Sequence, residues 1–380
     1  MDENRFFPEI KKNFGFGLMR LPMVGSQVDT DQVSKMVDAF IDNGFNYFDT
    51  AHGYIGGLSE CAVKTCLSSR YPREKFLLTD KLTESYFEKE EDIVPFFESQ
   101  LEACGVDYFD FYLMHAQNKT NFEKFKKCNA YETAFKLKEE GKIKHVGLSF
   151  HDTADVLRNI LTQYPQIEIV QIQFNYLDYD DPSVQSKEVY DVCEEFHKPV
   201  IVMEPVKGGS LVNLSPEAQM VLDDLNKSQG TSYSNAGYAI RYAASFPSMC
   251  MVLSGMSSFD QMNDNISAMK DFSILNEEEI KAVYTVSDII KSVKQIPCTS
   301  CHYCVLDNHC PKDIKIPELF SCYNAKIKYN DWNQNMYYEQ NTTDAGKASD
   351  CIKCGMCEKV CPQHLEIRNL LEEVAKTFEG

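Results

Sequence analysis

Two blocks of cysteine near the C-terminal end of the chain carry the residue type best suited to metal chemistry. The first, CTSCHYCVLDNHCP at 298–311, has the spacing C-x2-C-x2-C-x5-C-P, and the second, CIKCGMCEKVCP at 351–362, has C-x2-C-x2-C-x3-C-P. Such spacings let three thiolates converge on one iron–sulfur cube. Structural zinc sites and buried reduced thiols are alternatives. Because zinc takes four ligands, two runs of three cysteines plus a Cys-Pro favour iron–sulfur clusters.

The second block has the spacing that bacterial ferredoxins use for 4Fe-4S clusters, and the first resembles it with two extra residues before Cys310. In two-cluster ferredoxins the fourth ligand of each cluster comes from the other block. The resemblance therefore implies two clusters, one held by Cys298, Cys301, Cys304 and Cys361, and the other by Cys351, Cys354, Cys357 and Cys310.

The surroundings of the blocks predict a helical domain. Each Cys-Pro leads into a short apolar helix, within 310–320 and 361–371, and helix-like IPELFSCYNAKIKYND lies between the blocks. This layout resembles the α-helical ferredoxins, so we expect residues 276–380 to form a mainly helical 4Fe-4S domain. The remaining cysteines lack ligand spacing, and we expect small buried hydrophobic residues at 61, 66, 104, 128, 193, 250 and 322.

A second set of chemically capable residues lies at the ends of apolar, strand-like runs in the first part of the chain. Asp49, Lys81, His115, Ser149 and Glu204 each come at or near such an end, while Gln171 and Asn175 lie along another run. One polar residue at a strand end usually just meets solvent. Polar residues that recur at the same end of several successive runs indicate a shared site.

The runs themselves alternate with stretches of helical length such as DQVSKMVDAFIDNG and NFEKFKKCNAYETAFKLKEEGK, the second ending at Gly141. Near-continuous apolar runs suit strands buried on both faces. Eight strand–helix units predict an α/β fold, a (β/α)8 TIM barrel with its chemistry at the C-terminal ends of the strands. The eight runs are 14–21, 47–51, 76–82, 109–115, 145–150, 169–175, 199–205 and 249–255.

These segments resemble the aldo-keto reductases, in the family's order and spacing. The matching motifs are NYFDTAHGY with GGLSE (46–60), LLTDKL (77–82), DYFDFYLMH (107–115), KIKHVGLSF (142–150), IVQIQFNYLD (169–178), VMEPVKGGSL (202–211) and VLSGMSSFDQMNDN (252–265). The resemblance implies that residues 1–275 form the reductase barrel. The whole chain resembles bacterial aldo-keto reductases that carry a C-terminal ferredoxin-like domain.

The resemblance also implies a catalytic tetrad of Asp49, Tyr54, Lys81 and His115. Hydride addition to a carbonyl leaves an alkoxide, so a proton donor is needed at the oxygen, and Tyr54 takes that role. We expect the Lys81 ammonium to lower the pKa of the phenol and Asp49 to keep Lys81 charged and in place. His115 is expected to donate a hydrogen bond to the carbonyl oxygen. Singly, each has an ordinary structural interpretation: a loop cap, a core aromatic, a strand-end cation and a buried histidine.

The same resemblance implies which residues contact the cofactor. Ser149 and Gln171 are expected to bind the nicotinamide carboxamide, and the KGGS turn to approach a pyrophosphate. A helix beginning near Phe259 is expected to face a phosphate, with Ser257 or Ser258 as its cap. The expected cofactor residues are Ser149, Gln171, Glu204, Lys207, Gly208, Gly209, Ser254, Gly255, Ser257, Gln261 and Asn265.

The choice between NADP and NAD stays open. Residues 254–265 contain no Lys or Arg that could bind an adenosine 2′-phosphate, Glu204 stands where an aromatic often stacks on the nicotinamide, and Phe150 replaces a frequent Asn.

Composition limits the class of protein. A length of 380 residues predicts two domains, and 43% hydrophobic with 25% charged residues is typical of a soluble globular protein. No apolar run approaches a membrane span, and the acidic N-terminal segment does not look like a secretory signal, so we expect a cytoplasmic protein. There, 15 cysteines favour metal or catalytic use over disulfides. A net charge of −19 disfavours nucleic-acid and membrane partners.

Two functions remain from the sequence. The first is NAD(P)H-dependent reduction of a small aldehyde or ketone, or oxidation of the alcohol, with 177–191 and the loop after Lys81 on the substrate side. The second is a redox-sensing or electron-transfer module whose barrel binds the nicotinamide without significant turnover. Nicotinamides deliver two electrons as hydride whereas clusters pass one at a time, so the clusters would be structural, sensing, or a docking point for an external electron carrier.

Overall fold

The computed structural model describes residues 6–182, 184–292, 295–306, 309–329 and 334–380. It divides into two compact units. The first contains the described residues up to 181 together with 185–206 and 232–280, and the second contains 207–231 and the described residues from 281 to 380, with Pro182 and Val184. The boundary expected at residue 275 stays a prediction.

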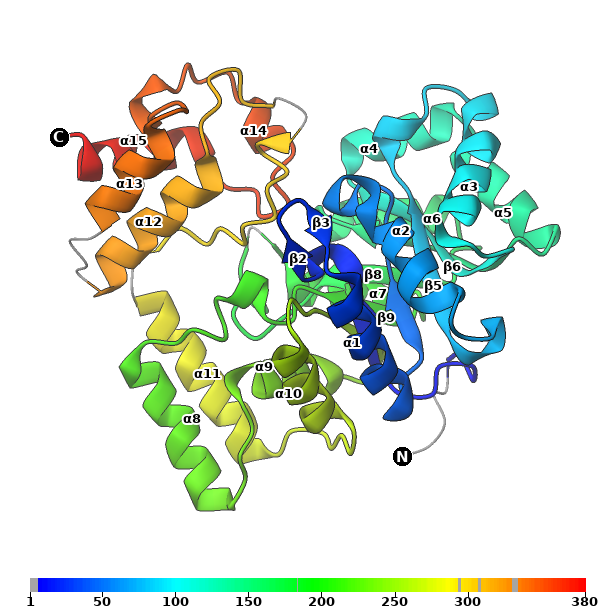
Figure 1. Ribbon diagram of the computed structural model, residues 1–380, viewed down its shortest axis with the longest axis horizontal. Coiled ribbons are helices and arrows are strands. Elements are labelled where there is room, and N and C mark those ends of the chain that lie inside the picture. The colour runs from blue at the N-terminus through cyan, green and yellow to red at the C-terminus, as the bar shows by residue number, and fades with distance from the viewer. Residues whose placement is uncertain (1–5, 183, 293–294, 307–308, 330–333) are drawn as a thin grey trace. The chain divides into compact units, whose positions relative to one another are not determined.

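The first unit is a closed barrel of eight parallel strands, as predicted (Figure 1). One strand lies within or across each apolar run of the sequence, and nearly every strand residue is buried. The strands are β1 (Phe14–Gly17), β4 (Tyr47–Asp49), β5 (Leu77–Leu82), β6 (Phe109–Gln117), β7 (Ile143–Phe150), β8 (Ile169–Gln173), β9 (Val200–Met203) and β10 (Met249–Gly255).

Helices connect successive strands and lie outside them (Figure 1). Their amphipathic faces cover the barrel; in α1, for example, Val33, Met36, Val37 and Phe40 are buried. The helices of this unit are α1 (Thr30–Asp42), α2 (Leu58–Val63), α3 (Glu90–Cys104), α4 (Lys119–Lys127), α5 (Ala130–Glu139), α6 (Ala154–Gln163), α7 (Ser186–Glu195), α9 (Asn235–Ala244) and α10 (Phe259–Met269).

Two local features differ from the sequence expectation. The single helix expected up to Gly141 is two helices, because Asn129 takes a left-handed backbone with φ of 50° between α4 and α5. A small hairpin of β2 (Met23–Val24) and β3 (Gln27–Val28) follows β1. Its strands of two residues are too short to leave a periodic pattern in the sequence, whereas Gly25, with φ of +60°, suits the turn.

The N-terminal end of the barrel is closed by the chain that precedes β1. Phe7 and Ile10 are buried in a cluster with Tyr47, Phe111 and Ile169, from the first halves of their strands. The Phe7 ring lies 5.2 Å from that of Phe111, edge to face. With this end filled by apolar side chains, the C-terminal ends of the strands are left to build a site.

The second unit is mainly helical around its own core, as the α-helical ferredoxin resemblance implied. Its core joins residues from both cysteine blocks to Leu319, Phe320, Leu371 and Val374. The helices are α8 (Pro216–Gln229), α12 (Ile316–Tyr329), α13 (Gln334–Thr342), α14 (Met356–Lys359) and α15 (Ile367–Phe378), while α11 (Glu277–Ser292) begins in the first unit and continues into the second.

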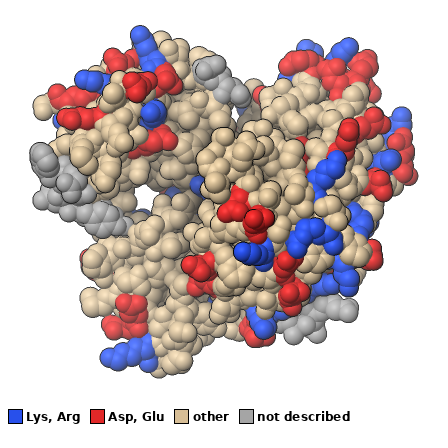
Figure 2. Space-filling view, viewed as in Figure 1, with Lys and Arg blue, Asp and Glu red and all other residues tan. Residues whose placement is uncertain are grey.

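The surface carries both signs of charge. Acidic and basic side chains are interspersed over the face seen in Figure 2, although acids outnumber bases by 57 to 38 in the whole chain. Within the described residues, no helix combines the length and apolar character needed to cross a membrane.

Gly147 tests the packing of the barrel. A Cβ on this residue would lie 2.6 Å from the Ile169 carbonyl oxygen and 2.7 Å from Leu113 Cδ2, whereas a Cβ on Gly17 would find its nearest atom at 3.4 Å. We expect Gly147→Ala to lower the free energy of unfolding by about 1–3 kcal/mol, the usual cost of overpacking. Denaturant unfolding of both variants measures this. Equal midpoints for Gly147→Ala and Gly17→Ala would contradict the packing described.

Candidate active site and cluster sites

Lys81 and Asp49 form a buried ion pair between neighbouring strands. Asp49 ends β4, which pairs with β5 so that Asp49 lies beside Thr79, and Lys81 follows on the same face. Lys81 Nζ donates to Asp49 Oδ1 at 2.6 Å and to the Thr50 carbonyl oxygen at 2.7 Å. Burial raises the pKa of Asp49, and the nearby Lys81 ammonium opposes that shift. The pair holds a cation at the C-terminal end of the barrel.

Tyr54 stands over this cation. It begins a short 3-10 turn, Tyr54–Gly57, in which Ile55 takes a left-handed backbone with φ of 53°. Lys81 Nζ lies 4.8 Å from the centre of the Tyr54 ring, and the His115 ring centre lies 6.1 Å from it. The structure therefore brings the four expected tetrad residues together.

The electrostatics of Tyr54 differ from the sequence expectation. Burial raises the pKa of the Tyr54 phenol well above its ordinary value, and the Asp49, Asp80 and Glu204 carboxylates add to the rise. The expected lowering by Lys81 is not seen, because the Lys81 ammonium is engaged by Asp49 and Thr50. In this state the phenol keeps its proton.

His115 is held as a neutral ring. Its Nδ1 lies 2.6 Å from Thr83 Oγ1. Burial lowers the pKa of His115 well below its ordinary value, with Lys81 and His151 contributing. When the Thr83 hydroxyl donates to Nδ1, the ring proton stays on Nε2 and can be donated to a substrate oxygen.

Residues expected to bind the nicotinamide lie on strands near the tetrad, where they already have partners. Ser149 Oγ accepts from the Ala116 backbone N–H at 2.8 Å. Gln171 Nε2 lies 3.4 Å from Asp49 Oδ2, so it lies beside the ion pair. Glu204 takes a left-handed backbone with φ of 58°, and its carbonyl oxygen accepts from Asn175 Nδ2 at 3.0 Å. Non-glycine residues in this conformation cluster at functional sites.

The residues expected around the adenosine end lie at β10 and α10. Asn265 Nδ2 donates to Ser254 Oγ at 2.8 Å, and both side chains are buried, while Gly255 ends β10. Ser258 caps α10 by accepting from the Gln261 N–H, and Gln261 Oε1 accepts from the Ser257 N–H at 2.7 Å.

Lys207, Gly208 and Gly209 do not belong to the same unit as the other expected cofactor residues. They fall in the second unit. There, Lys207 Nζ lies 3.2 Å from Gln363 Oε1, and Lys207 is buried. The KGGS motif did not predict this contact, because the same Gly-Gly turn can lie beside a phosphate or beside another loop of the protein.

Sequence reasoning missed a buried acidic network behind Lys81. Gln100 Nε2 donates to Glu60 Oε1 at 3.2 Å and to Asp80 Oδ1 at 3.1 Å, and both acids are buried. Burial raises the pKa of Asp80 well above its ordinary value, with the Glu60 charge adding to it. His52 Nδ1 lies 2.8 Å from Glu60 Oε2. The available signals were Asp80, directly before Lys81 in LLTDKL, and Glu60 at the end of GGLSE.

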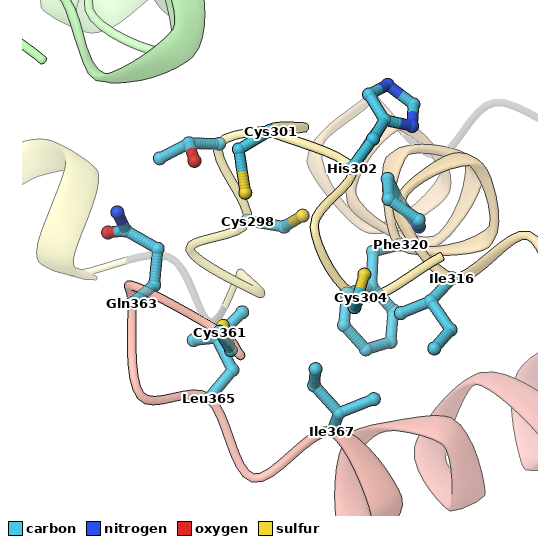
Figure 3. A pocket seen from close by; sticks show the side chains of 12 residues that line it. Cys298, Cys301, His302, Cys304, Ile316, Phe320, Cys361, Gln363, Leu365 and Ile367 are labelled. Carbon is cyan, nitrogen blue, oxygen red and sulfur yellow. The ribbon is translucent and has the colours of Figure 1, made fainter. Parts of the chain in front are cut away.

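The eight block cysteines line two separate cavities of the second unit. Cys298, Cys301, Cys304 and Cys361 line one with about 320 Å³ of empty space (Figure 3), and Cys310, Cys351, Cys354 and Cys357 line another of about 310 Å³. Each cavity thus combines three cysteines of one block with the fourth of the other, which is the crossed grouping expected from sequence.

The surroundings of these thiols suit a multi-iron cluster. Backbone N–H groups point at the sulfurs: Ser300 N lies 3.5 Å from Cys298 Sγ and Ile314 N lies 3.4 Å from Cys310 Sγ. Such donors stabilise thiolate charge. Among the described residues, no three Cys, His, Asp or Glu side chains stand in an arrangement that could hold a metal ion.

Comparison with known proteins agrees with both parts of this description. The sequence pattern of the aldo/keto reductase family matches residues 13–288. The chain belongs to the aldo/keto reductase family. The pattern of a 4Fe-4S dicluster domain matches residues 297–366, so this reductase carries an iron–sulfur domain after its barrel.

Related proteins cover the barrel rather than the whole chain. An oxidoreductase of Bacillus subtilis, YqkF, is 25% identical over an alignment of 310 residues that covers 73% of this chain and 94% of that protein. L-galactose dehydrogenase of Arabidopsis thaliana is 24% identical over 296 residues, covering 74% and 91%. The structure of an aldo/keto reductase from Klebsiella pneumoniae in complex with NADP and acetate aligns with a TM-score of 0.57 at 20% identity, covering 72% and 91%.

The opposite surroundings of two histidines predict opposite titrations. The hydrogen bond to Glu60 raises the pKa of His52, whereas burial lowers that of His115. At pH 6.5, the ordinary histidine pKa, we expect His52 mostly protonated and His115 neutral. Histidine-ring NMR measures both, with His52→Gln and His115→Asn identifying the signals. A His115 ring that gains its proton at or above pH 6.5 would show that the buried, neutral site described here is wrong.

Proposed function

We propose that this reductase transfers hydride between NAD(P)H and a small aldehyde or ketone, with Tyr54 as general acid, and that it also oxidises the corresponding alcohol. The observation that carries the proposal is the buried Lys81–Asp49 pair beneath the Tyr54 ring, with a neutral His115 beside it. Three groups suited to a carbonyl oxygen thus face one place: a phenol, an imidazole N–H and a nearby cation.

The residues divide the work as follows. His115 donates its N–H to the carbonyl oxygen and orients the substrate. Tyr54 gives up its proton as the oxygen becomes an alkoxide, a far stronger base than the phenolate left behind. Lys81 stabilises that phenolate, and Asp49 keeps Lys81 in place. Because burial raises the pKa of Tyr54, the phenol stays protonated until the alkoxide forms.

The nicotinamide, when bound, supplies the hydride. We propose that Ser149 and Gln171 bind its carboxamide and that Glu204 lines the neighbouring part of the pocket. The nucleotide end is proposed to contact Ser254, Gly255, Ser257, Gln261 and Asn265. The NADP in the Klebsiella pneumoniae neighbour supports the class of cofactor. The absence of Lys and Arg from 254–265 leaves NAD as an equal candidate.

For the iron–sulfur domain we propose two 4Fe-4S clusters, one in each cavity, with the four lining cysteines as ligands. Thiolate ligands need a reducing compartment, and the cytoplasm fits. An external electron carrier remains a possible partner.

Tyr54→Phe is the decisive variant. It removes the proton donor and leaves the ring in place, so we expect carbonyl reduction to fall by about 10²–10⁴-fold, the usual contribution of a positioned acid. NAD(P)H oxidation with a panel of small carbonyls measures this, and a fluorescence titration checks that the cofactor still binds. Tyr337→Phe, at an exposed tyrosine of the second unit, is the control. Unchanged turnover in Tyr54→Phe would favour the sensing module over the enzyme.

The cluster assignment predicts iron content. Anaerobically purified protein should contain about eight iron and eight sulfide per chain, as expected for two cubes. Cys301→Ser and Cys354→Ser should each remove half of both, because each removes one ligand from one cavity. Zinc in place of iron, or loss of all iron from either variant, would contradict two separate clusters.

A further inference from the structure

The segment Lys207–Gly208, four residues beyond the end of β9, is built into the surroundings of the first cysteine cavity. Lys207 Nζ lies 3.2 Å from Gln363 Oε1, and Lys207 and Gln363 are 3% and 4% exposed. Gln363 lies on the same loop as Cys361 and lines the cavity (Figure 3). Lys207 therefore holds the loop that presents the fourth cysteine.

Gly208 makes a second, independent contact with the other cysteine loop. A Cβ at this position would lie 2.4 Å from the Thr299 carbonyl oxygen and 3.0 Å from the Thr299 Cα. Thr299 is buried between Cys298 and Cys301 and also lines the cavity. A contact with backbone atoms cannot be relieved by a side-chain rotation, so only glycine fits while this loop stays in place.

These two contacts reach both chain segments that supply cysteines to one cavity. Three thiols come from 298–304 and the fourth from 361, and Lys207–Gly208 contacts each segment beside a cysteine. An iron–sulfur cube with four thiolate ligands is anionic, so an ammonium near its ligand loops favours the loaded state electrostatically.

We propose that Lys207 and Gly208 are positioning residues for the first cluster, holding together the two loops that present Cys298, Cys301, Cys304 and Cys361. This rests on the proposed cluster assignment. The alternative role of Lys207, binding of the cofactor pyrophosphate, predicts a different result in the same experiments.

The test compares two neighbouring glycines. Gly208 and Gly209 both have positive φ, +61° and +96°, but a Cβ on Gly209 would find nothing within 4 Å. Both substitutions carry backbone strain, with no less of it at Gly209, whose φ lies outside the left-handed helical region, and only Gly208→Ala disturbs Thr299. Lys207→Met removes the ammonium, and Lys376→Met, at an exposed lysine of α15 that lines neither cavity, is its control.

The readout is the anaerobic release of iron from the full-length protein to a ferrous chelator, followed by the loss of cluster absorbance. Half of the iron should leave Gly208→Ala and Lys207→Met about 10- to 100-fold faster than wild type, the usual effect of losing an outer-shell partner. Gly209→Ala and Lys376→Met should release iron as wild type does.

Two results would overturn the proposal. Equal iron release from Gly208→Ala and Gly209→Ala would mean that the Thr299 contact does not support the cluster. Normal iron release from Lys207→Met with weaker NADPH binding would return Lys207 to the pyrophosphate. A wild-type protein with fewer than two clusters would instead refute the cluster assignment, and the iron count separates that failure from the first two.

Discussion

The buried pair of Lys81 and Asp49 is the interaction on which the catalytic end of the barrel depends. Two charges taken out of water are costly, and each is tolerated only because the other is present. The barrel supplies the geometry: β4 and β5 are neighbours in register, so a carboxylate at the end of one meets an ammonium on the next. Losing either partner would leave an uncompensated charge beneath Tyr54, with consequences for folding as well as for chemistry.

The charges around that pair explain why Tyr54 keeps its proton. Lys81 donates hydrogen bonds to the Asp49 carboxylate and to the Thr50 carbonyl oxygen. The negative charge of Asp49 therefore offsets the effect of the Lys81 ammonium on the pKa of the phenol. Asp80, one residue before Lys81 and therefore on the other face of β5, and Glu204 add to the rise in the pKa of Tyr54. A protonated phenol beside a neutral imidazole is a suitable ground state for the general-acid role proposed for Tyr54.

Much of this could be predicted from the sequence where the signal was local or repeated. Eight apolar runs predicted eight strands, and polar residues at their ends were grouped correctly because parallel strands share one C-terminal edge. Contacts between distant segments had no such signal. The break at Asn129 depends on one residue's backbone, the partners of Gln100 come from three separate elements, and the Lys207–Gln363 contact joins residues 156 apart.

The contacts of Lys207 and Gly208 also bear on how the iron–sulfur domain is joined to the reductase barrel. Clusters pass single electrons and nicotinamides pass two as hydride, so direct electron transfer between them needs a converter. The chain leaves β9 through Glu204, whose carboxylate influences Tyr54, and three residues later Lys207 belongs to the second unit. The chain therefore passes within three positions from a residue of the barrel's site to a residue that contacts Gln363, on the loop of Cys361.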